Sequence, residues 1–96
     1  MILEHVHIQL RPGERDAYLE NFKVAKPLVR SQAGCISCEL LPKLNAEHEF
    51  LLLIRWEKVS DHTEGFRQSA AYQQWSALLH PFYAEFPAVD YFVLPD

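Results

Sequence analysis

Hydrophobic and polar residues alternate along the first ten positions of the chain. One face of this segment carries Ile2, Val6, Ile8 and Leu10, and the other carries His5, His7 and Gln9. A repeat of two residues is typical of a strand with one buried face. We therefore predict a half-buried strand over residues 2–10, which ends at the turn Arg11-Pro12-Gly13.

From Glu14 the apolar positions take on the spacing of a helix. They form one stripe that consists of Tyr18, Phe22, Ala25 and Val29. Such a stripe is typical of a helix that packs one face on a core. Pro27 has no amide hydrogen, which predicts a kink or an early end of the helix. Gly34 is the expected C-cap.

Two further strands are predicted after this helix. Residues 35–41 form the first of them, closed by Pro42. Residues 43–47 then form a hairpin loop, in which Asn45 is suited to a positive φ. Residues 48–57 are nearly all apolar, which predicts a central strand covered on both faces.

A second helix is predicted after the third strand, with Ser60 as its N-cap and a restart at Ser69. Its apolar stripe consists of Tyr72, Trp75, Leu78 and Leu79. Pro81 breaks this helix, and residues 88–94 form a fourth strand.

The predicted order is β-α-β-β-α-β, the ferredoxin-like arrangement of an α+β protein with an antiparallel sheet. At 96 residues, we expect a single domain over residues 1–96. The hydrophobic fraction of 49% is more than so small a monomer readily buries. We therefore expect a homodimer in which two sheets pack face to face.

The charge of the chain argues against nucleic-acid binding, because the net charge is -4 and no cluster of Lys and Arg is present. The first residues lack the apolar core of a signal peptide. No apolar run approaches the roughly 20 residues that cross a bilayer. We expect a cytoplasmic protein that binds neither nucleic acid nor membrane.

The chain resembles the antibiotic biosynthesis monooxygenase-like family in four short sequence motifs, which occur in the order and at the separations expected for that family. They are Arg11-Pro12-Gly13, Gly34-Cys35, Trp56-Glu57 and the segment from Phe66 to Trp75. The resemblance covers essentially the whole chain. It implies a dimeric α+β barrel with a pocket in each subunit, between the sheet and the helices. For the oxygenase members it implies flat, electron-rich substrates such as hydroquinones and anthrones, and no metal or flavin, because the deprotonated substrate reduces oxygen itself.

Two positions depart from the pattern of this family. Many relatives carry a histidine where this chain has Phe66, so chemistry that depends on that imidazole is absent. The haem-degrading branch uses an asparagine in the first strand, and the corresponding stretch His5-Val6-His7 has none. The resemblance therefore disfavours haem cleavage and leaves quinol oxygenation open.

His5 and His7 are the candidate catalytic residues. They are two positions apart on a predicted strand, so both side chains leave the same face. Such a pair is suited to accept a proton or to supply two metal ligands. No carboxylate or cysteine is spaced to provide an obvious third ligand, so we predict no metal site. The alternative is a pair of hydrogen-bonded imidazoles with a purely structural role.

The candidate substrate-binding residues are Trp56, Arg55, Phe66, Arg67, Tyr72 and Trp75. The flat indole of Trp56 is suited to stacking on a planar ligand. Either arginine is suited to holding a phenolate or carboxylate oxygen. Core packing is the alternative for the aromatic residues, and surface ion pairs are the alternative for the arginines.

Cys35 and Cys38 have the spacing of a redox motif, but such motifs lie at a helix N-terminus. In a strand, residues three apart point to opposite faces. We therefore predict two reduced thiols with no disulfide between them. His62 and His80 flank the second helix, and we predict that both lie on the surface.

Two functions from different classes remain open at this point. The first is a cofactor-independent monooxygenase that acts on a hydroxylated aromatic or quinol. The second is a non-enzymatic dimer that binds a small ligand or serves a stress-related role. They differ in whether the pocket is open or is filled by Phe66, Trp75 and Phe82. An isomerase or decarboxylase is a third alternative, by analogy of fold alone.

Overall fold

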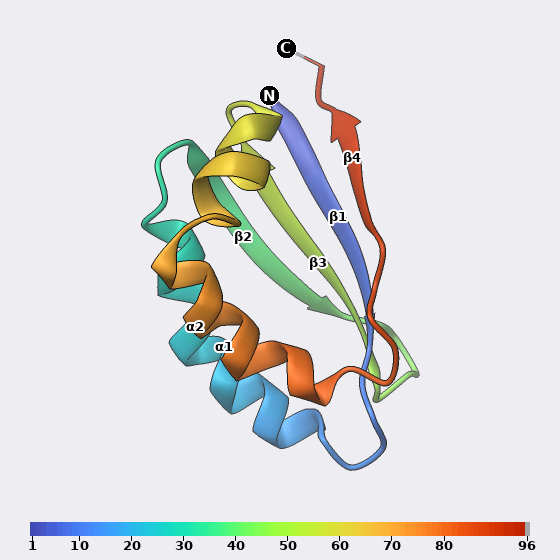
Figure 1. The fold of residues 1–96 in the computed structure, drawn as a ribbon. Coiled ribbons are helices and arrows are strands. Elements are labelled where there is room, and N and C mark those ends of the chain that lie inside the picture. The colour runs from blue at the N-terminus through green and yellow to red at the C-terminus, as the bar shows by residue number, and fades with distance from the viewer. Residues whose placement is uncertain (96) are drawn as a thin grey trace.

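The structure is a computed structural model in which residues 1–95 are described. The elements are β1 (Ile2–Gln9), α1 (Arg15–Arg30), β2 (Cys35–Pro42), β3 (Glu49–Trp56), the π-helical turn η1 (Asp61–Phe66), α2 (Ala70–Leu79), the short 3-10 helix η2 (His80–Phe82) and β4 (Val89–Val93). The strands form one antiparallel sheet in the order β2-β3-β1-β4. Both α-helices cover the same face of the sheet (Figure 1). This is the predicted ferredoxin-like α+β fold.

The core lies between this inner face of the sheet and the two helices. Alternation along β3 directs Phe50, Leu52, Ile54 and Trp56 toward the helices, and each is at most 3% exposed. The predicted stripe of α1 is buried against them as well. Among the helices of residues 1–95, none combines the length and apolar character that a membrane crossing requires.

The opposite face of the sheet carries no helix within residues 1–95 (Figure 1), and we call it the outer face. It presents Leu3, His5, His7 and Gln9 of β1, Leu51, Leu53 and Arg55 of β3, Glu39 and Leu41 of β2, and Asp90 and Phe92 of β4. Leu51 and Leu53 are only half-buried. The prediction that the third strand is covered on both faces is therefore wrong within a single chain.

The end of α1 differs from the prediction. The helix continues past Pro27 to Arg30, and the amide of Ser31 donates to the carbonyl of Pro27 at 3.1 Å. Ser31 is the C-cap. Gly34 has a positive φ of 83°, but it lies in the loop before β2, where its carbonyl accepts from the amide of Glu57 at 2.8 Å.

The second helix begins later than predicted. Ser60 has a helical backbone and its side chain makes no capping hydrogen bond. Ser69 caps α2 instead, since its hydroxyl oxygen accepts from the amide of Tyr72 at 3.1 Å. The predicted restart at Ser69 is thus the true start of α2. Asn45 has the predicted positive φ, at 61°.

Candidate active site

A small cavity lies between the inner face of the sheet and the segment that runs from η1 through α2 to β4. Its volume is about 50 Å³. Phe66, Tyr72 and Trp75 line it, and the exposed Arg67 lies where it reaches the surface. Four of the six predicted substrate-binding residues therefore come together here.

The aromatic rings in the wall pack edge to face. The ring centroids of Phe66 and Tyr72 are 5.3 Å apart at an angle of 89°, and those of Phe66 and Trp75 are 5.6 Å apart at 80°. An apolar cavity of about 150 Å³ binds benzene, so the present volume of about 50 Å³ suits water molecules rather than a ring. Of the three residues whose side chains would fill a closed pocket, Phe66 and Trp75 line the cavity, whereas Phe82 packs on Tyr18, with ring centroids 6.0 Å apart.

A buried polar cluster forms one side of the cavity. Glu4 and His62 both line it, and they are only 4% and 3% exposed. Glu4 Oε2 lies 3.5 Å from His62 Nε2, and Trp56 Nε1 donates to Glu4 Oε1 at 2.9 Å. The hydroxyl of Tyr91 contacts His62 Nδ1 at 2.5 Å. We call these four residues the Glu4–His62 cluster.

Burial controls the protonation of this cluster. It raises the pKa of Glu4 to about 7, although the hydrogen bond from Trp56 and the charge of Arg67 act in the opposite direction. Burial, with a further contribution from Arg67, lowers the pKa of His62 to about 4. Both shifts disfavour the charged form. Between about pH 4 and pH 7 both groups are therefore uncharged, and the 3.5 Å contact between Glu4 and His62 is not a standing ion pair.

Glu4, His62 and Tyr91 of the cluster come from three different elements, and the first two of these side chains face the cavity. Glu4 occupies an inward position of β1, on the same face as Val6. His62 comes from η1, whose π-helical character is seen in the hydrogen bond from the Arg67 amide to the His62 carbonyl at 2.9 Å. Turns of this kind occur frequently at functional sites. Tyr91 of β4 lies directly opposite Glu4 in the sheet.

The other two predicted substrate-binding residues do not line the cavity. Trp56 is fully buried behind the cluster and stacks on His62, with ring centroids 5.5 Å apart. It holds Glu4 and His62 in place rather than facing a ligand. Arg55 is exposed on the outer face, opposite Leu3 in the pairing of β1 and β3.

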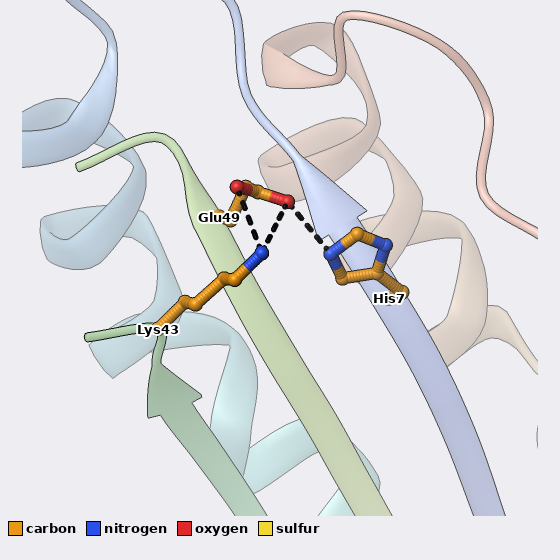
Figure 2. A network of polar contacts seen from close by, with 3 residues as sticks. All are labelled: His7, Lys43 and Glu49. Atoms are coloured by element: carbon orange, nitrogen blue, oxygen red, sulfur yellow. Dashed lines mark hydrogen bonds and ion pairs between the residues drawn. The ribbon is translucent and has the colours of Figure 1, made fainter. Parts of the chain in front are cut away.

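The two predicted catalytic histidines lie on the outer face, with the sheet between them and the cavity. His7 Nε2 is 3.0 Å from Glu49 Oε1, and Lys43 Nζ is 3.4 Å from Glu49 Oε2 (Figure 2). Desolvation acts to raise the pKa of Glu49, but Lys43 and His7 hold it below its ordinary value. His5 packs edge to face on Phe92, with centroids 5.6 Å apart. A catalytic role for His5 and His7 stays a prediction, and it requires a site on the outer face.

Sequence analysis missed Glu4 and misplaced His62. Glu4 falls between Ile2 and Val6 on the apolar face of an alternating strand, and a charged residue at such a position signals a buried ionisable group. The prediction that His62 lies on the surface is wrong, because η1 directs its ring into the core. No apolar repeat in η1 signals this orientation.

A bulge in β2 changes the predicted orientation of the cysteines. Because of this irregularity, Cys35 pairs with Trp56 and Cys38 pairs with Ile54, so both thiols face the helices. The prediction of opposite faces is wrong. Both cysteines are free, as predicted, and burial raises the pKa of Cys38 to about 12. Within residues 1–95, no three His, Cys, Asp or Glu side chains gather in a way that could hold a metal ion.

Residues 1–78 match the family described as antibiotic biosynthesis monooxygenase. This chain belongs to that family. It is 39% identical over 92 residues to the uncharacterized protein YczJ of Bacillus subtilis, a match that covers 96% of this chain and 97% of YczJ. The predicted family is therefore confirmed, while YczJ supplies no substrate.

Solved structures confirm the fold. A Bordetella bronchiseptica protein that is provisionally assigned to the same family matches with a TM-score of 0.92 at 31% identity, over 98% of this chain and 96% of that one. A Nitrosomonas europaea protein matches with a TM-score of 0.85 at 15% identity, over 97% of each chain. The second likeness concerns the fold alone.

Proposed function

We propose that this protein is a cofactor-independent monooxygenase that acts on a hydroxylated aromatic or quinol-type small molecule. The observation that carries the proposal is the cavity, where aromatic walls, a buried carboxyl–imidazole pair and an arginine meet in a member of this family. Aromatic walls suit a flat ring. A guanidinium suits the oxygen of an ionised substrate. The protein then needs only to bind, ionise and desolvate a substrate that itself reduces oxygen.

A ring enters this cavity only if the cavity enlarges. Phe86 is 67% exposed and lines the cavity together with Pro87. Both belong to residues 84–88, which lie between η2 and β4 and have no regular secondary structure. Outward movement of Phe86 and Pro87 alone makes room in the cavity, because the Ala84 amide stays bonded to the Gln9 carbonyl on one side and the pairing of β4 begins at Val89 on the other. In the proposal, the segment is therefore the entrance.

The experiment is oxygen uptake by metal-stripped protein, in chelator, against a panel of hydroquinones, anthrones and catechols. We expect uptake above the uncatalysed rate. Arg67→Ala removes the cation at the cavity and should lower the rate. Arg55→Ala removes a cation that lies on the outer face and should retain it. An equal loss of oxygen uptake in both variants, or oxygen uptake that depends on added metal, would contradict the proposal.

A non-enzymatic role in binding a small ligand or in stress is the second candidate. The observation that favours it is the volume of about 50 Å³, which the wall residues leave too small for a ring. Folded protein that consumes no oxygen with any compound of the panel would select this candidate.

We also propose that two copies of the chain associate through the outer face. Proteins of this family typically dimerise. Leu51 and Leu53 are only half-buried at the centre of this face, and Phe92 is 51% exposed at its edge. A second sheet packed there would cover these side chains and place His7 near the interface. The hydrophobic fraction of 49%, which is more than a monomer of this size readily buries, supports the same arrangement.

A further inference from the structure

We propose that the Glu4–His62 pair, rather than His5 or His7, takes the proton of a hydroxylated ligand bound in the cavity. The proposal rests on the oxygenase function proposed above and names the proton acceptor of that site.

Position is the first argument for this assignment. A proton acceptor must lie within hydrogen-bond reach of the hydroxyl that it serves. Glu4 and His62 both line the cavity, whereas His5 and His7 line a groove on the outer face, which shares Phe86 and Pro87 with the cavity. Glu4 lies on the inner face of β1, whereas His5 and His7 lie on its outer face, so the sheet stands between these histidine rings and the pair.

Both members of the pair are also held in place by neighbouring side chains. Trp56 Nε1 donates to one carboxylate oxygen of Glu4, and the hydroxyl of Tyr91 contacts the far ring nitrogen of His62. Glu4 Oε2 and His62 Nε2, which are 3.5 Å apart, are then the atoms of the pair that can take the proton of a ligand. An acceptor oriented by a third group is the arrangement that proton-transfer sites use repeatedly.

The proton transfer balances within the cavity. The O–H bond of the ligand breaks, its proton passes to the Glu4 carboxylate, and the electron pair stays on the ligand oxygen as a phenolate. Glu4 loses one negative charge and the ligand gains one, so the net charge of the site is unchanged. The guanidinium of Arg67 then lies near the new anion.

Ionisable groups surround Glu4 on every element that packs against it. They are His62 of η1, Arg67 after it, Tyr72 of α2, His80 of η2, Tyr83, Tyr91 of β4, and Cys35 and Cys38 of β2. Arg67 is the permanent charge among these groups, and it acts against the burial that raises the pKa of Glu4 to about 7. Burial lowers the pKa of His80, so this ring is neutral above pH 7. The carboxyl is therefore an acceptor just above neutrality.

The first arm of the test uses the free protein. Infrared difference spectra between acidic and mildly basic pH should show the carbonyl band of a buried protonated carboxyl, which disappears near pH 7. Glu4→Gln should lack this band. Glu49→Gln should keep it, because that carboxylate also contacts a histidine ring, at 3.0 Å, but lies outside the cavity. Absence of the band in the wild type would overturn the proposal without reference to any ligand.

The second arm uses catechol, without oxygen, at about pH 8. At this pH Glu4 is a carboxylate, whereas free catechol, an ordinary phenol, is still protonated, and its ionised form is followed by ultraviolet absorption. We expect the bound probe to ionise with no release of protons to a pH-indicator dye, because the pair keeps the proton. Ionisation should be lost in Glu4→Gln and reduced in His62→Gln. With oxygen and a substrate that turns over, Glu4→Gln should lower kcat about 100-fold or more, and the rise of kcat/KM through pH 7 should vanish.

The outcomes separate this proposal from the oxygenase proposal. Ionisation that survives in Glu4→Gln, or that releases a proton to the dye, would overturn the role of the pair while leaving oxygen uptake possible. Loss of ionisation and turnover in His7→Gln but not in Glu4→Gln would assign proton acceptance to His7 on the outer face instead. Failure of the probe to bind any variant would overturn the proposed substrate class and this role together.

Discussion

Substitution of either member of the Glu4–His62 pair should change how stability depends on pH, in opposite directions. In the folded chain, the pKa of Glu4 rises from an ordinary 4.5 to about 7, and that of His62 falls from an ordinary 6.5 to about 4. In the unfolded chain both groups regain their ordinary values. Between pH 4.5 and 6.5, folded and unfolded states therefore each hold one proton on the pair. The pair contributes no net slope to wild-type stability in this range.

The separate contributions have opposite signs. Folded Glu4 keeps a proton that the unfolded state has released, so its contribution to the free energy of unfolding falls as pH rises from 4.5 to about 7. Unfolded His62 holds a proton that the folded state lacks, so its contribution rises between about pH 4 and pH 6.5. Both side chains are nearly inaccessible, at 4% and 3% exposed. Each contribution is therefore on the order of 3 kcal/mol over its range.

Urea unfolding followed by circular dichroism, at several pH values and one protein concentration, measures these slopes. A fixed concentration is needed because self-association adds to apparent stability. Relative to the wild type, Glu4→Gln should gain stability as pH rises and His62→Gln should lose it. Glu49→Gln should give a nearly flat difference above pH 4.5, since the pKa of that half-buried carboxyl lies below its ordinary value. Flat differences for both buried variants would refute the neutral-pair account.

Three further substitutions test other parts of the structure. Phe86→Ala should lower the Kd of 4-nitrocatechol with little change in Tm, because this ring lines the cavity and is 67% exposed; an unchanged Kd would place the entrance elsewhere. Gly34→Ala should reduce the free energy of unfolding, measured in urea, by about 1–2 kcal/mol. Gly34 has a positive φ, and an added Cβ would overlap the Asp61 carboxylate; an unchanged free energy of unfolding would show that neither effect strains the loop. In sedimentation velocity, Leu53→Glu should yield monomers, while Val24→Glu on α1 should leave the dimer intact. Dimers in both variants would rule out the outer face as the dimer interface.

The fold was predictable because its elements carry regular apolar repeats. The stripe of α1 from Tyr18 to Val29 is buried as its spacing predicts. Alternation in β1 also assigns His5 and His7 correctly to the face opposite Val6. Element ends were less predictable, because Ser60 and Ser69 have the same capping chemistry and only the backbone at Ser69 is extended.

The site was predictable in its aromatic part and not in its polar part. Phe66, Tyr72 and Trp75 converge because two of them share a face of α2 and the third closes η1. The burial of His62 depends on a π-helical turn, which leaves no periodic signal. Glu4 was detectable in principle as a charge on an apolar face, but its partners lie 52 residues away at Trp56 and in η1.

A heteronuclear NMR titration of the assigned protein with 4-nitrocatechol shows where on the molecule a phenolic ligand binds. We expect the amide shifts to gather at Glu4, His62, Arg67 and Tyr72, around the cavity between the sheet and α2. Shifts confined to the outer face, around His7, would contradict this expectation, and so would the absence of any shift at saturating probe.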